Sequence, residues 1–319
     1  MHPEETKKKT LKEHLKYRYH SRKKKLLFTL KGFHANWLIF KKNKMGLFGL
    51  GLLICFGLMA LASFILPLID PMYHPMTGVD PMIFSSKGPS LTHWLGTDSL
   101  GRDILSQLLV GARVAFMIGV SAAFMTVTIG TTVGLLAGYF GKTVDFLLMR
   151  FADIILVLPD LLVIIILAAV IGGGKLSIWN IVIVISLLGW AGTARVVRSQ
   201  TLSLKQRPYV DAAKISGSSE FGIIHRHIVP NIIPLSLLYM TFRVTSAILV
   251  EAALSFLGFG DTSTVSWGMM LQWCWKTGHM FKAPYWLLPP GISISLITLS
   301  FYLIGRAMEE IVNPRLRER

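Results

Sequence analysis

Six predominantly apolar runs constrain the fold of this chain more than any other feature. They cover residues 46–68, 114–137, 154–171, 178–194, 232–250 and 287–304. A helix needs about twenty mostly apolar residues to cross the hydrocarbon core of a bilayer. The sequence therefore predicts an all-α polytopic membrane protein with about six transmembrane helices.

The basic residues are distributed unequally over the segments between these runs. With the N-terminus in the cytoplasm, roughly 26 basic residues lie on that side and about five on the other. Lys and Arg accumulate in the cytoplasmic loops of membrane proteins. We therefore expect a multi-pass protein of the cell membrane whose N- and C-termini are both cytoplasmic.

The net charge of +16 does not indicate a nucleic-acid partner. About half of the 33 Lys and Arg residues precede Met45, directly before the first apolar run. A basic segment in this position is attracted to anionic lipid headgroups, by about 1 kcal/mol per residue. We divide the chain into a basic cytoplasmic or interfacial segment (1–45), a first helix with an outer loop (46–110) and a core (111–319).

One polar segment between two apolar runs, residues 207–230, is too long for a simple connection. Pro208 can open a helix, and Asp211 suits the positive end of its dipole. Gly217 supplies a left-handed turn, after which a second short helix begins. Ala212 and Ala213 are expected to form a surface with short side chains, and Pro230 is expected to end the second helix. These features predict a bent helical knob that presents a partner-binding surface in the cytoplasm.

The same segment resembles the coupling motif of permease subunits of ABC importers. The resemblance rests on Asp211-Ala212-Ala213, on Gly217 four residues later, and on His227-Ile228-Val229-Pro230. Asp211, His227 and Val229 depart from the Glu, Ile and Leu that are usual in that family. Three further blocks resemble the peptide and nickel branch: Leu95–Asp103, Glu251–Gly258 and Ser266-Trp267-Gly268, followed by the ending Asn313-Pro314-Arg315.

This resemblance implies a type I ABC importer permease (MetI-like) fold that forms half of a translocation pore. It implies four partners, namely a homologous second permease, two cytoplasmic ATPase subunits and an extracytoplasmic solute-binding protein. The chain is then not an enzyme and holds no cofactor or metal, because ATP and Mg bind to the ATPases. The resemblance assigns ATPase coupling to Asp211, Ala212, Ala213, Gly217, His227 and Pro230. It leaves the solute open between peptides, nickel, glutathione and oligosaccharides.

Three ionisable residues lie at membrane depth, where a charge is costly and therefore a candidate for function. Arg243 and Glu251 are eight residues apart and share one face of a helix. Asp160 follows Pro159 in the third apolar run. Each of the three residues is a candidate to line the substrate pathway, and each could instead have a structural role.

Other patterns in the sequence favour structure over chemistry. Gly130, Gly134 and Gly138 form a small-residue stripe that lets two membrane helices approach closely. The aromatic residues between 267 and 286 predict an interfacial belt. The functional alternative to an ATP-driven permease is a secondary transporter or channel that works without ATP, for which Asp160 and Arg243 are the best coupling groups.

Overall fold

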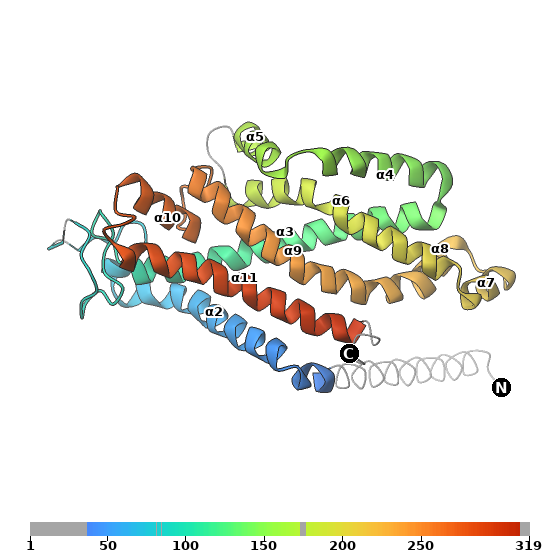
Figure 1. Cartoon of the computed structure of the whole chain (residues 1–319), viewed down its shortest axis with the longest axis horizontal. Coiled ribbons are helices and arrows are strands. Elements are labelled where there is room, and N and C mark those ends of the chain that lie inside the picture. The colour runs from blue at the N-terminus through green and yellow to red at the C-terminus, as the bar shows by residue number, and fades with distance from the viewer. Residues whose placement is uncertain (1–36, 81, 84, 173–176, 313–319) are drawn as a thin grey trace, which may run out of the picture.

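The chain folds into an elongated bundle of helices (Figure 1). A computed structural model describes residues 37–80, 82–83, 85–172 and 177–312. In this part of the chain the regular backbone is helical, apart from one isolated bridge between Thr97 and Asp103. The elements are α2 (Lys44–Ile69), η1 (Pro71–Tyr73), α3 (Ile104–Phe140), α4 (Lys142–Val157), α5 (Asp160–Gly172), α6 (Ile178–Lys205), α7 (Pro208–Ile215), α8 (Glu220–Ile223), η2 (Ile224–Ile228), α9 (Val229–Leu257), α10 (Trp267–Lys276) and α11 (Pro284–Val312).

Five of the described helices are long and apolar enough to cross a membrane: α2, α3, α6, the continuous helix from α8 through α9, and α11. The all-α membrane fold predicted from the sequence is thereby confirmed. The prediction of a single helix over residues 154–171 is wrong, because α4 ends and α5 begins within it. Leu158 has an extended backbone (ψ 138°), and the following Pro159 disfavours the helical conformation at that residue.

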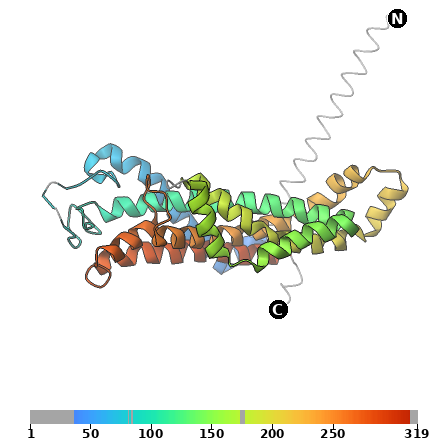
Figure 2. The same cartoon turned by 90° about the horizontal axis from the view of Figure 1, so that it is seen from above.

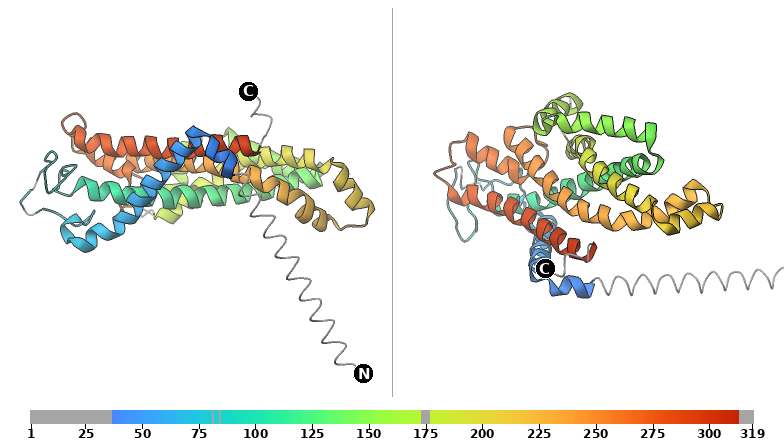
Figure 3. Two further views of the ribbon diagram at one scale, coloured as in Figure 1. Left: turned by 90° about the horizontal axis from the view of Figure 1, so that it is seen from below. Right: turned by 45° about the vertical axis from the view of Figure 1, so that its right-hand side comes forward.

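The broken pair α4–α5 nevertheless has the course of a sixth span (Figures 1 and 2). Together the two helices return the chain from the end of α3 to the start of α6. The helices α7 and α8 then lie at one end of the bundle, and α10 lies at the other with the loop over residues 70–103. The start of α2 and the end of α11 point toward the α7–α8 end. Figure 3 also shows that α2 runs obliquely past α11. The basic segment before residue 37 and the ending Asn313-Pro314-Arg315 lie outside the described residues.

The glycine stripe of α3 packs directly on α6, as the sequence predicts. A Cβ atom at Gly134 would lie 2.4 Å from the carbonyl oxygen of Ala194, and one at Gly138 would lie 2.7 Å from Cβ of Thr201. Close backbone contact of this kind maximises van der Waals packing, which drives helix association in lipid. The two helices therefore form the rigid centre of the bundle.

A buried ion pair fixes the start of α3. The Asp98 carboxylate accepts a hydrogen bond from Nε of Arg102 at 2.7 Å and another from Nε2 of Gln107 at 2.9 Å. Asp103 caps the helix by accepting from the backbone N–H of Ser106 at 2.7 Å. Charge pairing and capping thus fix the entry into α3 within this sequence block.

Removal of the Asp98 carboxylate is expected to destabilise the fold. The variant Asp98→Ala leaves the guanidinium of Arg102 buried and unpaired, which should lower the free energy of unfolding by about 3–5 kcal/mol. The double variant Asp98→Ala/Arg102→Ala leaves no such charge and should lose less. Thermal unfolding in detergent measures both, and a double variant that is less stable than the single one would contradict this interpretation.

Two of the tryptophans between residues 267 and 286 lie in the core of the bundle and not in an interfacial belt. Trp267 and Trp286 are fully buried, and Nε1 of Trp267 donates to the carbonyl of Leu108 at 2.9 Å. Trp275 alone of these three tryptophans is largely exposed. The short helix α10 therefore packs through buried side chains against α3 and α9, at the end of the bundle opposite α7 and α8.

Candidate functional site

The polar segment predicted as a knob projects from one end of the bundle (Figures 1 and 2). Pro208 occupies the first turn of α7, and Gly217 has a left-handed backbone (φ 77°). The N–H of Ser218 donates to the carbonyl of Ala213 at 3.1 Å, which closes the C-terminus of the helix. Ser219 then caps α8 through the N–H of Gly222. We call residues 207–230 the knob.

A small hydrophobic core packs the knob against the neighbouring helices. Its members come from α3, α6, the knob itself and α9: Tyr139, Val197, Leu204, Val210, Ala213, Ile223, Ile228 and Ile232. Ala213 is buried in this core. The expectation that it forms part of an exposed surface is therefore wrong, because the apolar face of α7 turns inward onto the bundle. A movement of the knob must be shared with the helices whose side chains fill the same core.

The outward face of the knob carries large apolar side chains that the sequence reasoning missed. Ile215 is 89% exposed and Phe221 is 77% exposed, and Tyr209 is also exposed. Ala212 lies on the same open surface, beside an ion pair between Asp211 and Lys214 (3.1 Å). The sequence did contain a sign of this surface. Apolar residues occur in the polar segment at positions that do not share a helix face with the buried residues of the knob. Exposed apolar groups gathered at one tip are typical of a protein–protein contact.

The helix does not end at Pro230, contrary to the sequence-based expectation. Residues 224–228 form a π-helix that continues into α9, and Pro230 is the second residue of α9. The ring of His225 stacks on Phe221 (centroids 6.0 Å apart), and His227 lies beside Tyr209. The knob is therefore coupled to α9 without a break in the helical backbone.

The left-handed backbone at Gly217 predicts which substitutions this position tolerates. A β-branched residue is strained in this conformation, so Gly217→Val should add about 1–3 kcal/mol of backbone strain to the knob. The strain should distort the knob and weaken its binding to a partner protein. Gly217→Asn is the matched control, because Asn tolerates the left-handed region. Partner association and membrane insertion are measured for both, and equal binding by Gly217→Val and the wild type would contradict the prediction.

The three candidate pathway residues lie in different surroundings. The Arg243 side chain crosses from α9 to α6, where its Nε donates to the hydroxyl of Thr193 at 3.2 Å and its Nη2 covers Gly192. Asp160 begins α5 on an exposed surface, within electrostatic reach of Arg243. Glu251 is buried and accepts from Ser255 of its own helix at 2.6 Å. Arg243 is thus bonded to Thr193, with Asp160 within electrostatic reach and not in an ion pair with it, and Glu251 has separate partners.

The chain is similar to known transport proteins along most of its length. The family described as "Binding-protein-dependent transport system inner membrane component" matches residues 130–318. The chain belongs to this family. A second family, the N-terminal transmembrane domain of oligopeptide transport permease C, matches residues 33–86.

Curated relatives of this permease align over most of the chain. The dipeptide transport system permease protein DppC of Bacillus subtilis is 35% identical over 286 residues, which are 88% of this chain and 85% of that protein. The glutathione transport system permease protein GsiD of Pectobacterium atrosepticum is 36% identical over 73% of this chain and 76% of its own length. The four sequence blocks thus correctly indicated the family.

A solved structure supports the fold. The permease resembles a chain of the MetNI methionine ABC transporter in an inward-facing conformation, with a TM-score of 0.51 and 17% sequence identity. The match covers 65% of this chain and 94% of that chain. At this identity the similarity bears on the fold alone, and it confirms the MetI-like permease architecture.

Proposed function

We propose that this permease forms half of the translocation pore of an ATP-driven importer for peptides or similar small solutes. In this proposal the knob, through Asp211, Ala212, Ala213, Gly217, His227 and Pro230, couples the pore to cytoplasmic ATPase subunits. Ala213 acts from inside the knob as a packing residue, and the others act at or near its surface. The relatives named for dipeptide and glutathione transport support the class of solute.

The strongest support for this proposal comes from the structure of the knob. The knob combines exposed apolar side chains at its tip with a core that it shares with α3, α6 and α9. A protein that binds the tip can therefore transmit a displacement to three membrane helices at once. Such coupling requires that the partner bind the two conformations of the pore with different free energies.

The remaining partners and the orientation belong to the same proposal. A second, homologous permease completes the pore, and an extracytoplasmic solute-binding protein delivers the solute at the end formed by α10 and the loop over residues 70–103. The knob and both termini lie in the cytoplasm, and ATP and Mg bind to the two ATPases. No comparison favours the ATP-independent alternative.

Reconstitution tests the proposal. The chain is co-expressed with a candidate second permease and candidate ATPases, and the purified complex is placed in liposomes with a solute-binding protein. We expect the ATPases to co-purify and peptide uptake to require ATP. Uptake by the permeases alone, driven by an ion gradient, would overturn the proposal.

A further inference from the structure

One histidine in the loop over residues 70–103 lies between two carboxylates. The ring of His93 is buried. Its Nδ1 lies 2.9 Å from Oδ1 of Asp103, and its Nε2 lies 3.3 Å from Oδ2 of Asp80. The ring of Tyr73, in η1, lies beside it with the two centroids 6.3 Å apart. We call the three residues His93, Asp80 and Asp103 the histidine clamp.

The two carboxylates of the clamp belong to different parts of the chain. Asp103 is the N-cap of α3, and its second oxygen accepts from the backbone N–H and the hydroxyl of Ser106 at 2.7 and 2.6 Å. Asp80 ends the segment over residues 70–80 that follows α2, which we call the first limb of the loop. The carbonyl of His93 accepts from the N–H groups of Ser90 and Gly96, so His93 itself sits in an ordered turn. The clamp therefore ties the first limb to the start of α3.

Both hydrogen bonds of the His93 ring can exist together only when the ring is charged. A carboxylate accepts hydrogen bonds and donates none, and a neutral imidazole has a single N–H, whereas the imidazolium has two. Loss of the proton therefore breaks one of the two bonds. Asp103 is buried and cannot turn to water, whereas the side chain of Asp80 is 13% exposed. The neutral ring is thus expected to keep its N–H for Asp103 and to release Asp80.

The partners of His93 keep their own charge states while histidines titrate. The backbone N–H of Met82 and the His93 ring hold the pKa of Asp80 below its ordinary value, so this group stays a carboxylate. Burial and the nearby Asp103 raise the pKa of Tyr73, so its phenol stays neutral. The other titratable or charged groups around the clamp are Asp70, Lys87, the ion pair of Asp98 with Arg102, and Tyr285 of α11 against Gly96.

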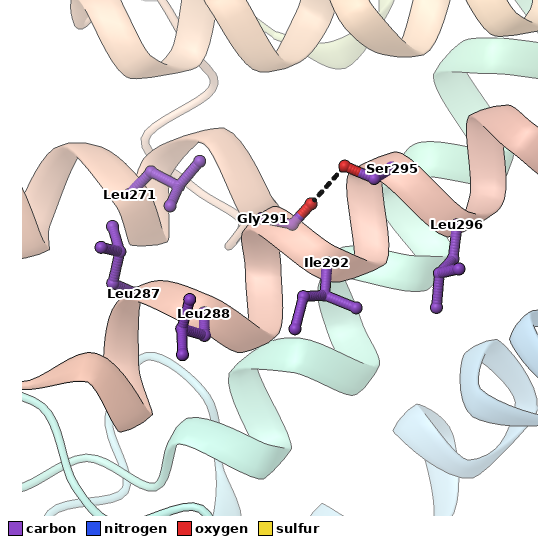
Figure 4. A pocket seen from close by; sticks show the side chains of 7 residues that line it. All are labelled: Leu271, Leu287, Leu288, Gly291, Ile292, Ser295 and Leu296. Carbon is purple, nitrogen blue, oxygen red and sulfur yellow. Dashed lines mark hydrogen bonds between the residues drawn. The ribbon is translucent and has the colours of Figure 1, made fainter.

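A groove at the same end of the bundle adds no titratable group. It lies between α10 and α11, has a volume of about 330 Å³ and is lined by four leucines, Gly291, Ile292 and Ser295 (Figure 4). The hydroxyl of Ser295 donates to the carbonyl of Gly291 in its own helix at 3.0 Å. A response of this end of the bundle to pH is therefore not expected from the groove.

We propose that the histidine clamp is a pH-sensitive switch, which holds the first limb on α3 while His93 is charged and releases it when His93 loses its proton. The sign follows from the charges, because a rise in pH removes the proton that one of the two bonds requires. The loop is therefore closed on the acidic side of this titration and open on the alkaline side. In the proposed orientation the loop faces the external medium, so the external pH sets the surface that the solute-binding protein meets. Only this last consequence rests on the proposed function.

The distance between two spin labels tests the switch. Labels are attached to Met82→Cys, directly after the first limb, and to Leu91→Cys, in the turn of His93, and both native side chains are largely exposed. The full chain, with Cys55 and Cys274 replaced by Ala, is studied in lipid nanodiscs from about pH 5 to about pH 9, which spans the ordinary titration of histidine. We expect one narrow distance distribution at acidic pH and a second, longer distance at alkaline pH. The ratio of open to closed molecules should rise by up to about tenfold per pH unit, because one proton is released.

Two substitutions should act on the switch in opposite directions. His93→Asn keeps an N–H for Asp103 but has none that reaches Asp80, so the first limb should be open over the whole pH range. Asp80→Asn supplies an amide N–H that Nε2 of the neutral ring can accept, so the limb should stay closed over the whole range. His74→Asn is the matched control, because His74 is exposed in the same loop and its Nδ1 bonds only to Thr77. This control should keep the pH response of the wild type.

Three results would overturn the inference. They are a wild-type distance that does not change with pH, a loop that opens toward acidic pH, and an Asp80→Asn chain that still opens at alkaline pH. The last of these also decides the matter if His93→Asn does not fold, since loss of a merely structural contact would open the loop in both variants. ATP-driven uptake by the assembled transporter is measured separately, and its absence would refute the proposed function without affecting the switch.

Discussion

Replacement of both Ile215 and Phe221 by Asp is expected to abolish ATP-driven uptake and to weaken ATPase binding by about 30-fold or more. These side chains are 89% and 77% exposed at the tip of the knob. Large apolar residues at the centre of a protein–protein contact commonly contribute 2 kcal/mol or more, and a carboxylate there would lose its water on binding. Co-purification at graded ATPase concentrations measures the affinity.

The matched control is Leu91→Asp, at the opposite end of the helix bundle from the knob. Leu91 is 98% exposed in the loop over residues 70–103, so the same change of character occurs far from the knob. We expect unchanged ATPase binding by this variant. If the double variant at the knob also binds normally, the apolar tip is not the contact surface.

Substitution of Gly134 by Leu is expected to prevent assembly of the bundle. Even the Cβ atom would lie 2.4 Å from the carbonyl oxygen of Ala194 and 2.9 Å from Cβ of Val197. Backbone atoms cannot move aside without separation of α3 from α6, so the cost should exceed the usual overpacking cost of about 1–3 kcal/mol. Gel filtration in detergent and protease resistance report the loss of the folded form.

Gly57→Leu serves as the control for the same change in a membrane helix. Gly57 lies in α2, and a Cβ atom there would meet no heavy atom of the described residues within 4 Å. This variant should assemble like the wild type. A stable, monodisperse Gly134→Leu protein would show that α3 and α6 do not depend on close backbone contact.

The sequence predicted those features that depend on local composition. Apolar runs mark membrane helices because the bilayer sets their length. The glycine stripe marks a helix contact because close approach has few other causes at such spacing.

Features that depend on neighbouring helices could not be predicted in the same way. Ala213 and Trp267 are buried by packing partners that are distant in the sequence, namely α3 and α6 for the first and α3 for the second. Pro230 lies inside a continuous helix, directly after a π-helix that no local pattern in the sequence predicts. Pro159, by contrast, could have been taken as the end of a helix from its neighbours alone.

The candidate site was predicted in its location but only partly in its chemistry. The turn at Gly217 and the position of the knob were inferred from residues that favour turns and caps. Its apolar tip escaped notice, because exposure depends on which face of α7 turns toward the bundle. The ion pairs of Asp145 with Arg198 and of Asp153 with Arg195 likewise required knowledge that α4 lies beside α6.

The most direct test of the account is the accessibility of residue 215 from each side of the membrane. Ile215→Cys, in a chain with Cys55 and Cys274 replaced by Ala, is treated with an impermeant maleimide in oriented vesicles. The account predicts rapid labelling in inside-out vesicles, little labelling in right-side-out vesicles, and protection when the ATPase subunits are bound. Rapid labelling of right-side-out vesicles, or labelling that the ATPases do not slow, would contradict it.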